Sequence, residues 1–115
     1  MSSVKIKIQL VVNDDIAMGP GKADLLEAVV REGSISAAGR ALGMSYKRAW
    51  DLVNVMNKSF KQALIATSVG GDKGGGAQVT EFGLQVLAQY REIEAKTNAL
   101  VKDETKALIN MLTDS

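Results

Sequence analysis

The residues of this sequence best suited to chemistry form one short run, Ser45, Tyr46, Lys47 and Arg48. The two hydroxyl groups can donate hydrogen bonds to phosphate, and the two cations can bind phosphate or the edge of a guanine. Arg48 suits a bidentate contact with guanine, whereas Lys47 lies nearer the centre of the exposed helix face. The run therefore indicates nucleic-acid binding, with solvated surface charge as the alternative for both cations.

Catalytic chemistry has little support in the sequence. The chain has no cysteine and no histidine, so it lacks a thiolate nucleophile, a zinc–thiolate site and the commonest general base. The adjacent Asp14 and Asp15 are typical of solvated acids at the end of a strand. Residues 70–76 contain five glycines in seven positions but lack both the Gly-x-Gly-x-x-Gly register and the Gly-Lys-Ser/Thr of phosphate-binding loops. We expect no enzyme, no cofactor and no metal site.

Charge is balanced over the whole chain but segregated along it. The 14 Lys and Arg residues against 13 Asp and Glu leave a formal net charge of +1. Residues 40–80 carry six basic against two acidic residues, a net +4, whereas residues 1–39 (four against five) and 81–115 (four against six) are acidic. Positive charge is thus concentrated around the run described above, which favours double-stranded DNA as a partner.

Two short helices are predicted on either side of a glycine turn. Ser34 and Ser36 are both placed to cap a helix that ends at Gly43, and Ser45 is placed to cap the helix that follows. Gly39 is a small residue where the two helices cross. Two helices joined by such a turn form a helix-turn-helix unit, predicted here over about residues 34–57. A helical corner that binds no nucleic acid shares part of this pattern.

The second helix of a helix-turn-helix unit lies in the DNA major groove, with its N-terminal residues on base edges and phosphates. Its exposed side here carries Lys47, Asp51 and Asn54, whereas Trp50 borders the apolar stripe and is expected in the core. The predicted DNA-contacting residues are Ser34, Ser45, Tyr46, Lys47, Arg48, Asp51, Asn54 and Lys73.

A β-hairpin is predicted over about residues 63–79. A short apolar run covers residues 63–68, residues 77–79 are extended again, and the glycine-rich segment lies between them. Such a hairpin would form a wing whose Lys73 reaches the DNA backbone or the minor groove. An inert loop is the alternative.

Two further elements precede the helix-turn-helix. Apolar and polar residues alternate from Val4 to Val12, which is typical of a strand with one solvent-exposed face. Apolar residues then recur at helical spacing from Lys22 to Glu32, with Gly33 placed as the C-cap. We expect a strand and a helix over these two segments.

A long helix is predicted over about residues 80–112. Its apolar residues recur at alternating spacings of four and three, the seam of a coiled coil, although Thr97 and Glu104 are polar members. A helix of roughly 30 residues is about 45 Å long, more than a domain of this size can cover. We therefore expect a homodimer. The predicted interface residues are Val86, Tyr90, Ile93, Leu100, Ala107 and Met111.

Taken together, these elements predict one domain over residues 1–115, mainly α with a small β-hairpin wing: a winged helix-turn-helix with a long C-terminal dimerisation helix. No apolar run approaches the roughly 18 residues that a membrane span needs, and the N-terminus has lysines inside its apolar stretch. We expect a cytoplasmic protein.

Two motifs carry a likeness to a known family. The run GSISAAGRALGMSYKRAWDLVNVMN, followed by GGDKGGGAQVTEFG, resembles the N-terminal domain of the ModE family, the molybdate-responsive transcriptional regulators of bacteria, which is similar to the winged helix of LysR-type regulators. The likeness covers roughly residues 20–95. It implies a winged helix that dimerises through its long terminal helix and first strand, and that binds an inverted-repeat operator through Ser45–Arg48 and the wing.

The sequence departs from the fuller family pattern in one respect. Family members that sense molybdate carry a C-terminal pair of small β-barrel modules that bind the oxyanion, and no such segment follows here. The expectation is either a lone DNA-binding member whose effector is supplied otherwise, or a relative that has lost metal sensing, so no residue is assigned to molybdate. A dimeric winged-helix module that binds a protein partner is the alternative function.

Overall fold

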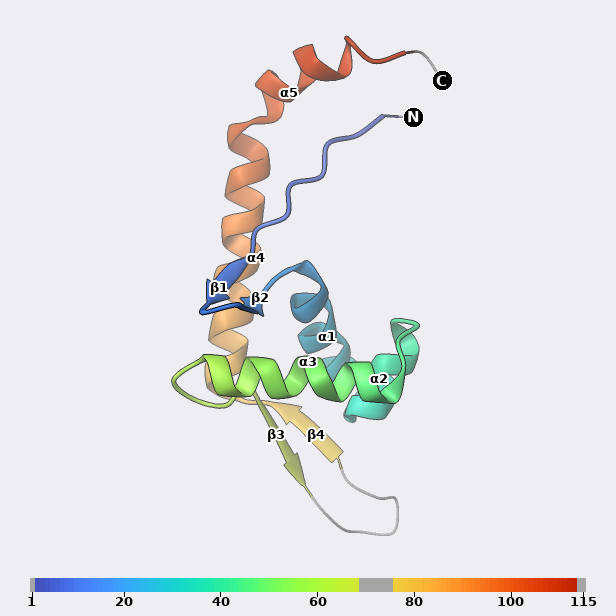
Figure 1. Cartoon of the computed structure of the whole chain (residues 1–115), viewed down its shortest axis with the longest axis vertical. Helices are drawn as coiled ribbons and strands as arrows, with labels where there is room; N and C mark the ends of the chain where they lie inside the picture. Colours follow the sequence, from blue (N-terminus) through green and yellow to red (C-terminus); the bar gives the residue numbers. More distant parts are fainter. Residues whose placement is uncertain (1, 69–75, 114–115) are drawn as a thin grey trace.

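The computed structural model describes residues 2–68 and 76–113. Its elements in chain order are β1 (Leu10–Val12), β2 (Asp15–Met18), α1 (Pro20–Glu32), α2 (Ile35–Ala41), α3 (Tyr46–Ser59), β3 (Ile65–Ser68), β4 (Gly76–Val79), α4 (Glu81–Leu100) and α5 (Lys102–Ile109). The helices α1, α2 and α3 and the hairpins β1–β2 and β3–β4 gather into a head, from which the long helix α4 projects (Figure 1). The hairpin β3–β4 is the wing.

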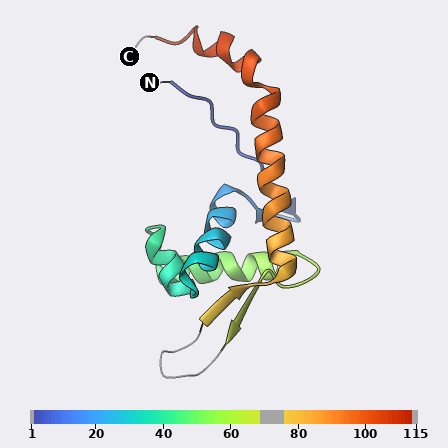
Figure 2. The same cartoon turned by 180° about the vertical axis from the view of Figure 1, so that it is seen from behind.

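The projecting helix makes the molecule elongated. Its principal extents are 57 × 31 × 24 Å, and its radius of gyration of 16.9 Å exceeds the ~13 Å typical of a compact chain of this length. The wing and the free end of α4 lie at opposite ends of the molecule in both views (Figures 1 and 2). The mainly α winged helix-turn-helix predicted from the sequence is confirmed. No helix among the described residues is long and apolar enough to cross a membrane.

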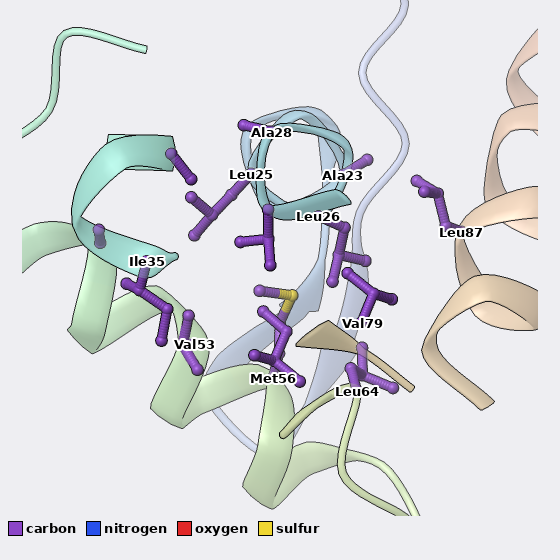
Figure 3. Packing of buried hydrophobic residues seen from close by; sticks show 14 of the residues in the cluster. Ala23, Leu25, Leu26, Ala28, Ile35, Val53, Met56, Leu64, Val79 and Leu87 are labelled. Atoms are coloured by element: carbon purple, nitrogen blue, oxygen red, sulfur yellow. The ribbon is translucent and has the colours of Figure 1, made fainter. Parts of the chain in front are cut away.

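One core holds the head together, and α1 lies at its centre. Figure 3 shows α1 side chains pointing toward those of α2, α3, the wing and α4. Burial of this apolar surface is the main driving force that fixes the helices relative to one another. The largest fully buried side chains are Met18, Leu25, Leu26, Val29, Val53, Met56 and Leu64.

Local capping sets the helix boundaries as predicted. Gly33 ends α1 in the left-handed region at φ 76°, where its N–H donates to the Val29 carbonyl at 2.9 Å. The Ser34 Oγ accepts a hydrogen bond from the Ala37 N–H at 3.0 Å, and the Ser45 Oγ accepts one from the Arg48 N–H at 3.1 Å. These caps satisfy amide groups that the first turns of α2 and α3 would otherwise leave unpaired.

The N-terminal strand is shorter than predicted. Only Leu10–Val12 is a strand, and it pairs antiparallel with β2, which the sequence pattern missed. Asn13 makes the tight turn between them at φ 56°, a conformation that asparagine tolerates better than most residues. The ladder ends where β2 ends, because an extended chain needs a partner for its backbone groups. Residues 2–9 meet α4 next to β1, where the Ile8 carbonyl accepts the Tyr90 hydroxyl, and toward the N-terminus they diverge from both α4 and the head (Figures 1 and 2).

The single long helix predicted over residues 80–112 is wrong, because the chain breaks into α4 and α5 at Val101. The Val101 N–H still donates to the Thr97 carbonyl at 3.3 Å, and the ladder resumes from Thr105 N to Val101 O at 3.0 Å. No residue of α5 is buried, so no tertiary contact in the described chain holds it in line with α4. The spacing of apolar residues predicts which face of a helix is apolar, but it does not predict whether the helix is continuous.

Candidate nucleic-acid interface

The turn between α2 and α3 has the close packing that the sequence predicted. A Cβ added at Gly39 would lie 3.1 Å from the Ala49 Cβ, so only glycine lets the two helices approach without displacement. Gly43 makes the turn at φ 71°, and the Met44 N–H closes it on the Gly39 carbonyl at 2.9 Å. The unit is therefore a rigid helix-turn-helix.

The first turn of α3 presents the predicted polar residues to solvent. Tyr46 is 60% exposed, and Ser45, Lys47 and Arg48 are exposed beside it. Because the Ser45 oxygen accepts the Arg48 N–H, its hydroxyl hydrogen points to a different acceptor and is available to a phosphate. The structure thus brings together two hydroxyl donors and two cations at one helix end.

The middle of α3 carries a charge pair on its exposed face. The Lys47 Nζ lies 2.8 Å from Asp51 Oδ2, with the two side chains 85% and 58% exposed. A pair this exposed is worth about 0–1 kcal/mol, so Lys47 can exchange the carboxylate for a phosphate at little cost. Asn54 is exposed one turn further along the helix. The predicted face is present, with Asp51 as a competitor for Lys47 and an acceptor for a cytosine amino group.

An aromatic pair orients the tyrosine of this surface. The rings of Tyr46 and Trp50 meet edge to face, with centroids 6.1 Å apart and planes at 66°. Trp50 is partly buried against the hydrophobic core, as predicted. Its Nε1–H is buried and has no acceptor within hydrogen-bonding distance in the described part of the chain. The partly buried Trp50 ring therefore packs against the exposed Tyr46 ring and holds its orientation.

Lys22, in the first turn of α1, is a further cation whose charge acts on Arg48, and the sequence patterns missed it. Burial lowers the pKa of the Lys22 ammonium, the positive charge of the Arg48 guanidinium lowers it further, and Asp15 opposes the shift. Lys22 belongs to another helix and stands 26 positions before Arg48, so no local spacing connects the two.

A side chain at the end of α3 fastens the wing to it. The Asn57 Oδ1 accepts hydrogen bonds from the N–H groups of Leu64 at 2.8 Å and Ile65 at 3.1 Å, and its Nδ2 donates to the Ile65 carbonyl at 3.0 Å. These three bonds couple the position of β3 to that of α3. Asn57 is a positioning residue that the sequence patterns did not identify, because an asparagine near a helix end has many uses.

The wing itself is a regular hairpin. β3 and β4 pair antiparallel from Ile65 with Val79 to Ser68 with Gly76. The Ala77 N–H donates to the Gly33 carbonyl at 2.9 Å, next to the capping Ser34, so β4 contacts the start of the helix-turn-helix. Ser34 is partly buried there. Lys73, the predicted wing contact, lies outside the described residues.

The predicted dimer seam is divided between core and surface. Tyr90 is only 3% exposed, and its hydroxyl donates to the Ile8 carbonyl at 2.7 Å, so it belongs to the core of the single chain and not to an exposed seam. Val86 is partly buried against the same core. Ile93 is 43%, Leu100 78% and Met111 80% exposed, and Ala107 is exposed as well. The exposed apolar face therefore begins beyond Tyr90.

Comparison with known protein families identifies the family of this domain. Residues 22–84, from the first turn of α1 to the first turn of α4, match the lysR family of bacterial regulatory helix-turn-helix proteins. The chain belongs to this family. A LysR-type helix-turn-helix is a DNA-binding unit, and the match includes the whole of α2, α3 and the turn between them. The match is to a regulatory family and not to an enzyme family, in agreement with the sequence prediction.

Relatives of this LysR-type domain include two proteins named ModE. The chain is 32% identical over 115 residues to the molybdenum transport protein ModE of Azotobacter vinelandii, covering 98% of this chain and 42% of that protein. It is 31% identical over 111 residues to the DNA-binding transcriptional dual regulator ModE of Escherichia coli, covering 94% of this chain and 42% of that protein. The chain thus spans less than half the length of these relatives.

A solved structure has the same fold. The full-length LysR-type regulator LysG of Corynebacterium glutamicum, with bound effector Arg, matches with a TM-score of 0.50 and 28% identity, covering 81% of this chain and 28% of that one. The likeness to the ModE family inferred from the helix-turn-helix and wing motifs agrees with these relatives.

Proposed function

We propose that this protein is a sequence-specific DNA-binding transcriptional regulator of molybdate transport or molybdenum-enzyme genes, and that it binds an inverted-repeat operator as a homodimer. The observation that carries the proposal is the exposed end of α3, where Ser45, Tyr46, Lys47 and Arg48 stand together on a rigid helix-turn-helix. The names of the relatives from Azotobacter vinelandii and Escherichia coli support the choice of genes. The proposal assigns molybdate to no residue of this chain.

The surfaces around α3 support a groove-binding pose. Asn57 couples the wing to the C-terminal end of α3, so hairpin and helix can engage adjacent parts of one DNA surface as a unit. Lys22 and Arg48 provide positive charge at the flank of α3. Phosphate contacts from such residues set the register of the helix in the groove, and base edges then specify the sequence.

The homodimer is supported by an apolar face that the single chain leaves uncovered. Leu100 and Met111 are 78% and 80% exposed, and Leu108 on α5 is 64% exposed. Exposed apolar side chains of this kind, at the end of α4 and along the segment that follows it, favour burial against a second copy. A two-fold dimer through this face would carry two α3 helices to half-sites about 34–36 Å apart, one helical turn of DNA.

Binding to labelled duplexes from upstream of molybdate transport genes tests the proposal, with fluorescence anisotropy measured over a range of salt concentrations. The double substitution Lys47→Ala/Arg48→Ala should lower affinity by about 100-fold if each side chain contributes a typical contact. The slope of log affinity against log salt should fall by about 0.9 for each phosphate contact removed.

The control removes the same charge elsewhere. Lys96→Ala/Lys102→Ala takes two exposed lysines from α4 and α5, outside the predicted contact set, and should leave affinity within about twofold of wild type if binding is local to α3. Sedimentation should show an unchanged dimer for both variants. Absence of any salt-sensitive DNA binding by the wild type at low ionic strength would contradict the proposed function.

A further inference from the structure

Arg91, in the middle of α4, binds the head through two carboxylates of α1 and pairs with a third carboxylate on α4 itself. Its Nη2 lies 2.7 Å from Asp24 Oδ1 and 2.6 Å from Glu27 Oε1, and its Nε donates to Glu27 Oε2 at 3.3 Å. Its Nη1 donates to Glu94 Oε1 at 2.9 Å, one turn further along α4. Asp24 and Glu27 both belong to α1. All three nitrogens of the guanidinium are therefore engaged, and two of them form a fork on Glu27.

The cluster is less exposed than the surface ion pair between Lys47 and Asp51. The Arg91 side chain is 30% exposed and that of Glu94 is 19% exposed. The hydrogen bond with Glu27, above all, raises the pKa of Arg91, against the opposing effect of burial. A planar guanidinium that uses two nitrogens on one carboxylate fixes orientation as well as distance, which a lysine ammonium cannot do.

The position of the cluster makes it the outermost tie between α4 and the head. Leu87 and Tyr90 pack in the core just before Arg91. Beyond Glu94, no described residue of α4 or α5 forms a hydrogen bond or ion pair with the head; the pairs there, such as Lys96 with Glu92 at 3.1 Å, stay within the helices. The direction in which the free part of α4 leaves the head is thus set by contacts that end at this cluster.

A small change in the direction of α4 relative to the head would move α3 by a distance comparable with one base-pair step of DNA. If the head tilts by about 10° on α4, a point about 20 Å from the pivot moves by about 3.5 Å, which is one base-pair step. In a two-fold dimer both heads would tilt, so the separation of the two α3 helices would change by up to twice that amount. The angle between α4 and α1 therefore determines which half-site spacing the dimer fits.

We propose that Arg91 is a positioning residue that fixes the angle between α4 and the head, and thereby the operator half-site spacing that the dimer accepts. This role rests on the proposed function, since it needs a DNA-binding dimer. The ion-pair cluster holds α4 against α1 at one angle. Without it, α4 keeps the core contacts of Gly83, Leu87 and Tyr90, which hold its N-terminal half but allow a wider range of angles, and each head still binds its own half-site.

Selection from a randomised duplex library tests this role with four proteins: wild type, Arg91→Gln, Arg91→Lys and the control Lys96→Gln. Wild type and Lys96→Gln should enrich pairs of half-sites at one spacing, because the Lys96 pair is exposed and lies within α4. Arg91→Gln should enrich the same half-site at several spacings. Its affinity for the duplex selected by wild type should fall about tenfold, the loss expected when two linked sites lose a fixed geometry. Arg91→Lys should be intermediate.

A DNA-independent measurement separates this role from the proposed function. The chain has no cysteine, so spin labels can be placed on cysteines introduced at Lys61 in the head and Ala95 on α4, in protein diluted with unlabelled chains. The distance distribution should be narrow in wild type and in Lys96→Gln, and broad in Arg91→Gln. Thermal unfolding checks that the variants are folded, and Asp24→Asn, which removes only the more exposed partner, should broaden the distribution less.

The outcomes are distinct. An unchanged distance distribution in folded Arg91→Gln overturns the positioning role whatever the DNA result. A broadened distribution with an unchanged single spacing overturns the link to operator spacing. Failure of the wild type to enrich any duplex contradicts the proposed function and this role with it, whereas normal wild-type enrichment together with relaxed spacing in Arg91→Gln supports both.

Discussion

Gly83, in the first turn of α4, is the position where one added methyl group should do most damage. It is buried, and an ideal Cβ there would overlap the Leu64 carbonyl oxygen and lie 2.8 Å from Val79 Cγ1. The Leu64 carbonyl cannot simply move aside, because it accepts the Thr80 N–H at 2.9 Å where the wing joins α4. The substitution Gly83→Ala must therefore shift backbone and not a flexible side chain.

The size of the effect follows from two opposing terms. Alanine in place of glycine favours the helix by up to about 1 kcal/mol. Overpacking of a well-packed site costs about 1–3 kcal/mol, and overlap with backbone is at or above the upper end of that range. We expect Gly83→Ala to lower the free energy of unfolding by about 2 kcal/mol or more, which corresponds to a fall of roughly 8 °C in Tm.

Two other glycines provide matched controls for the same chemical change. Around Gly21, in the first turn of α1, no atom lies within 4 Å of the added Cβ, so Gly21→Ala should be neutral or stabilising by up to about 1 kcal/mol. Gly39→Ala, with its 3.1 Å approach to Ala49, should fall between the two. Urea unfolding followed by circular dichroism, at one fixed protein concentration, ranks the three variants. Equal stability of the Gly83 and Gly21 variants would refute the packing argument.

Three further substitutions remove side-chain hydrogen bonds, and each is checked by urea unfolding. Asn57→Ala leaves buried wing amides without an acceptor and should lower the free energy of unfolding by about 2 kcal/mol. The control Asn54→Ala, on the exposed face, should stay within about 0.5 kcal/mol of wild type. Equal losses for the two variants would contradict the role of Asn57 in holding the wing. Ser45→Ala removes an N-cap and should cost about 1 kcal/mol, with loss of helix signal if α3 frays; no change would mean that solvent caps the helix equally well. Tyr90→Phe removes the bond to Ile8 and should cost about 1 kcal/mol. Burial, above all, raises the pKa of Tyr90, so the unfolded chain loses its phenol proton at a lower pH than the folded chain. The free energy of unfolding of the wild type should therefore fall as pH rises above about 10, and Tyr90→Phe should lack this fall. Parallel pH profiles for the two proteins would contradict the assignment.

The parts of the site that sequence patterns predicted are those governed by neighbours along the chain. A serine three residues before an amide it caps and a glycine at positive φ after a helix depend on contacts within a few residues, and the small residue where the two helices cross depends on Ala49, ten positions away. Ser34, Ser45, Gly39 and Gly43 were predicted correctly for this reason. The exposed residues at the start of α3 follow from the same local period.

The break at Val101 and the burial of Tyr90 could not be predicted in this way. A heptad pattern is the same for a straight helix and a broken one, and it does not distinguish an apolar face that meets the chain's own core from one that meets a second copy. The N-terminal strand shows the same limit. Alternation describes a strand's two faces, but the length of the ladder depends on β2, its partner.

The amino-acid sequence by itself determined the helix-turn-helix, its caps, the wing hairpin and the basic stretch that contains them, because each arises from residues close together in the chain. Tertiary structure alone decided which residues outside α3 support its exposed N-terminal end. Asn57 ties the wing to α3, Lys22 joins the flank of Arg48, and Arg91 joins Asp24 across 67 positions. Such contacts exist only after the core has brought α1, α3 and α4 together, since burial of apolar surface and not local spacing selects which polar groups then meet.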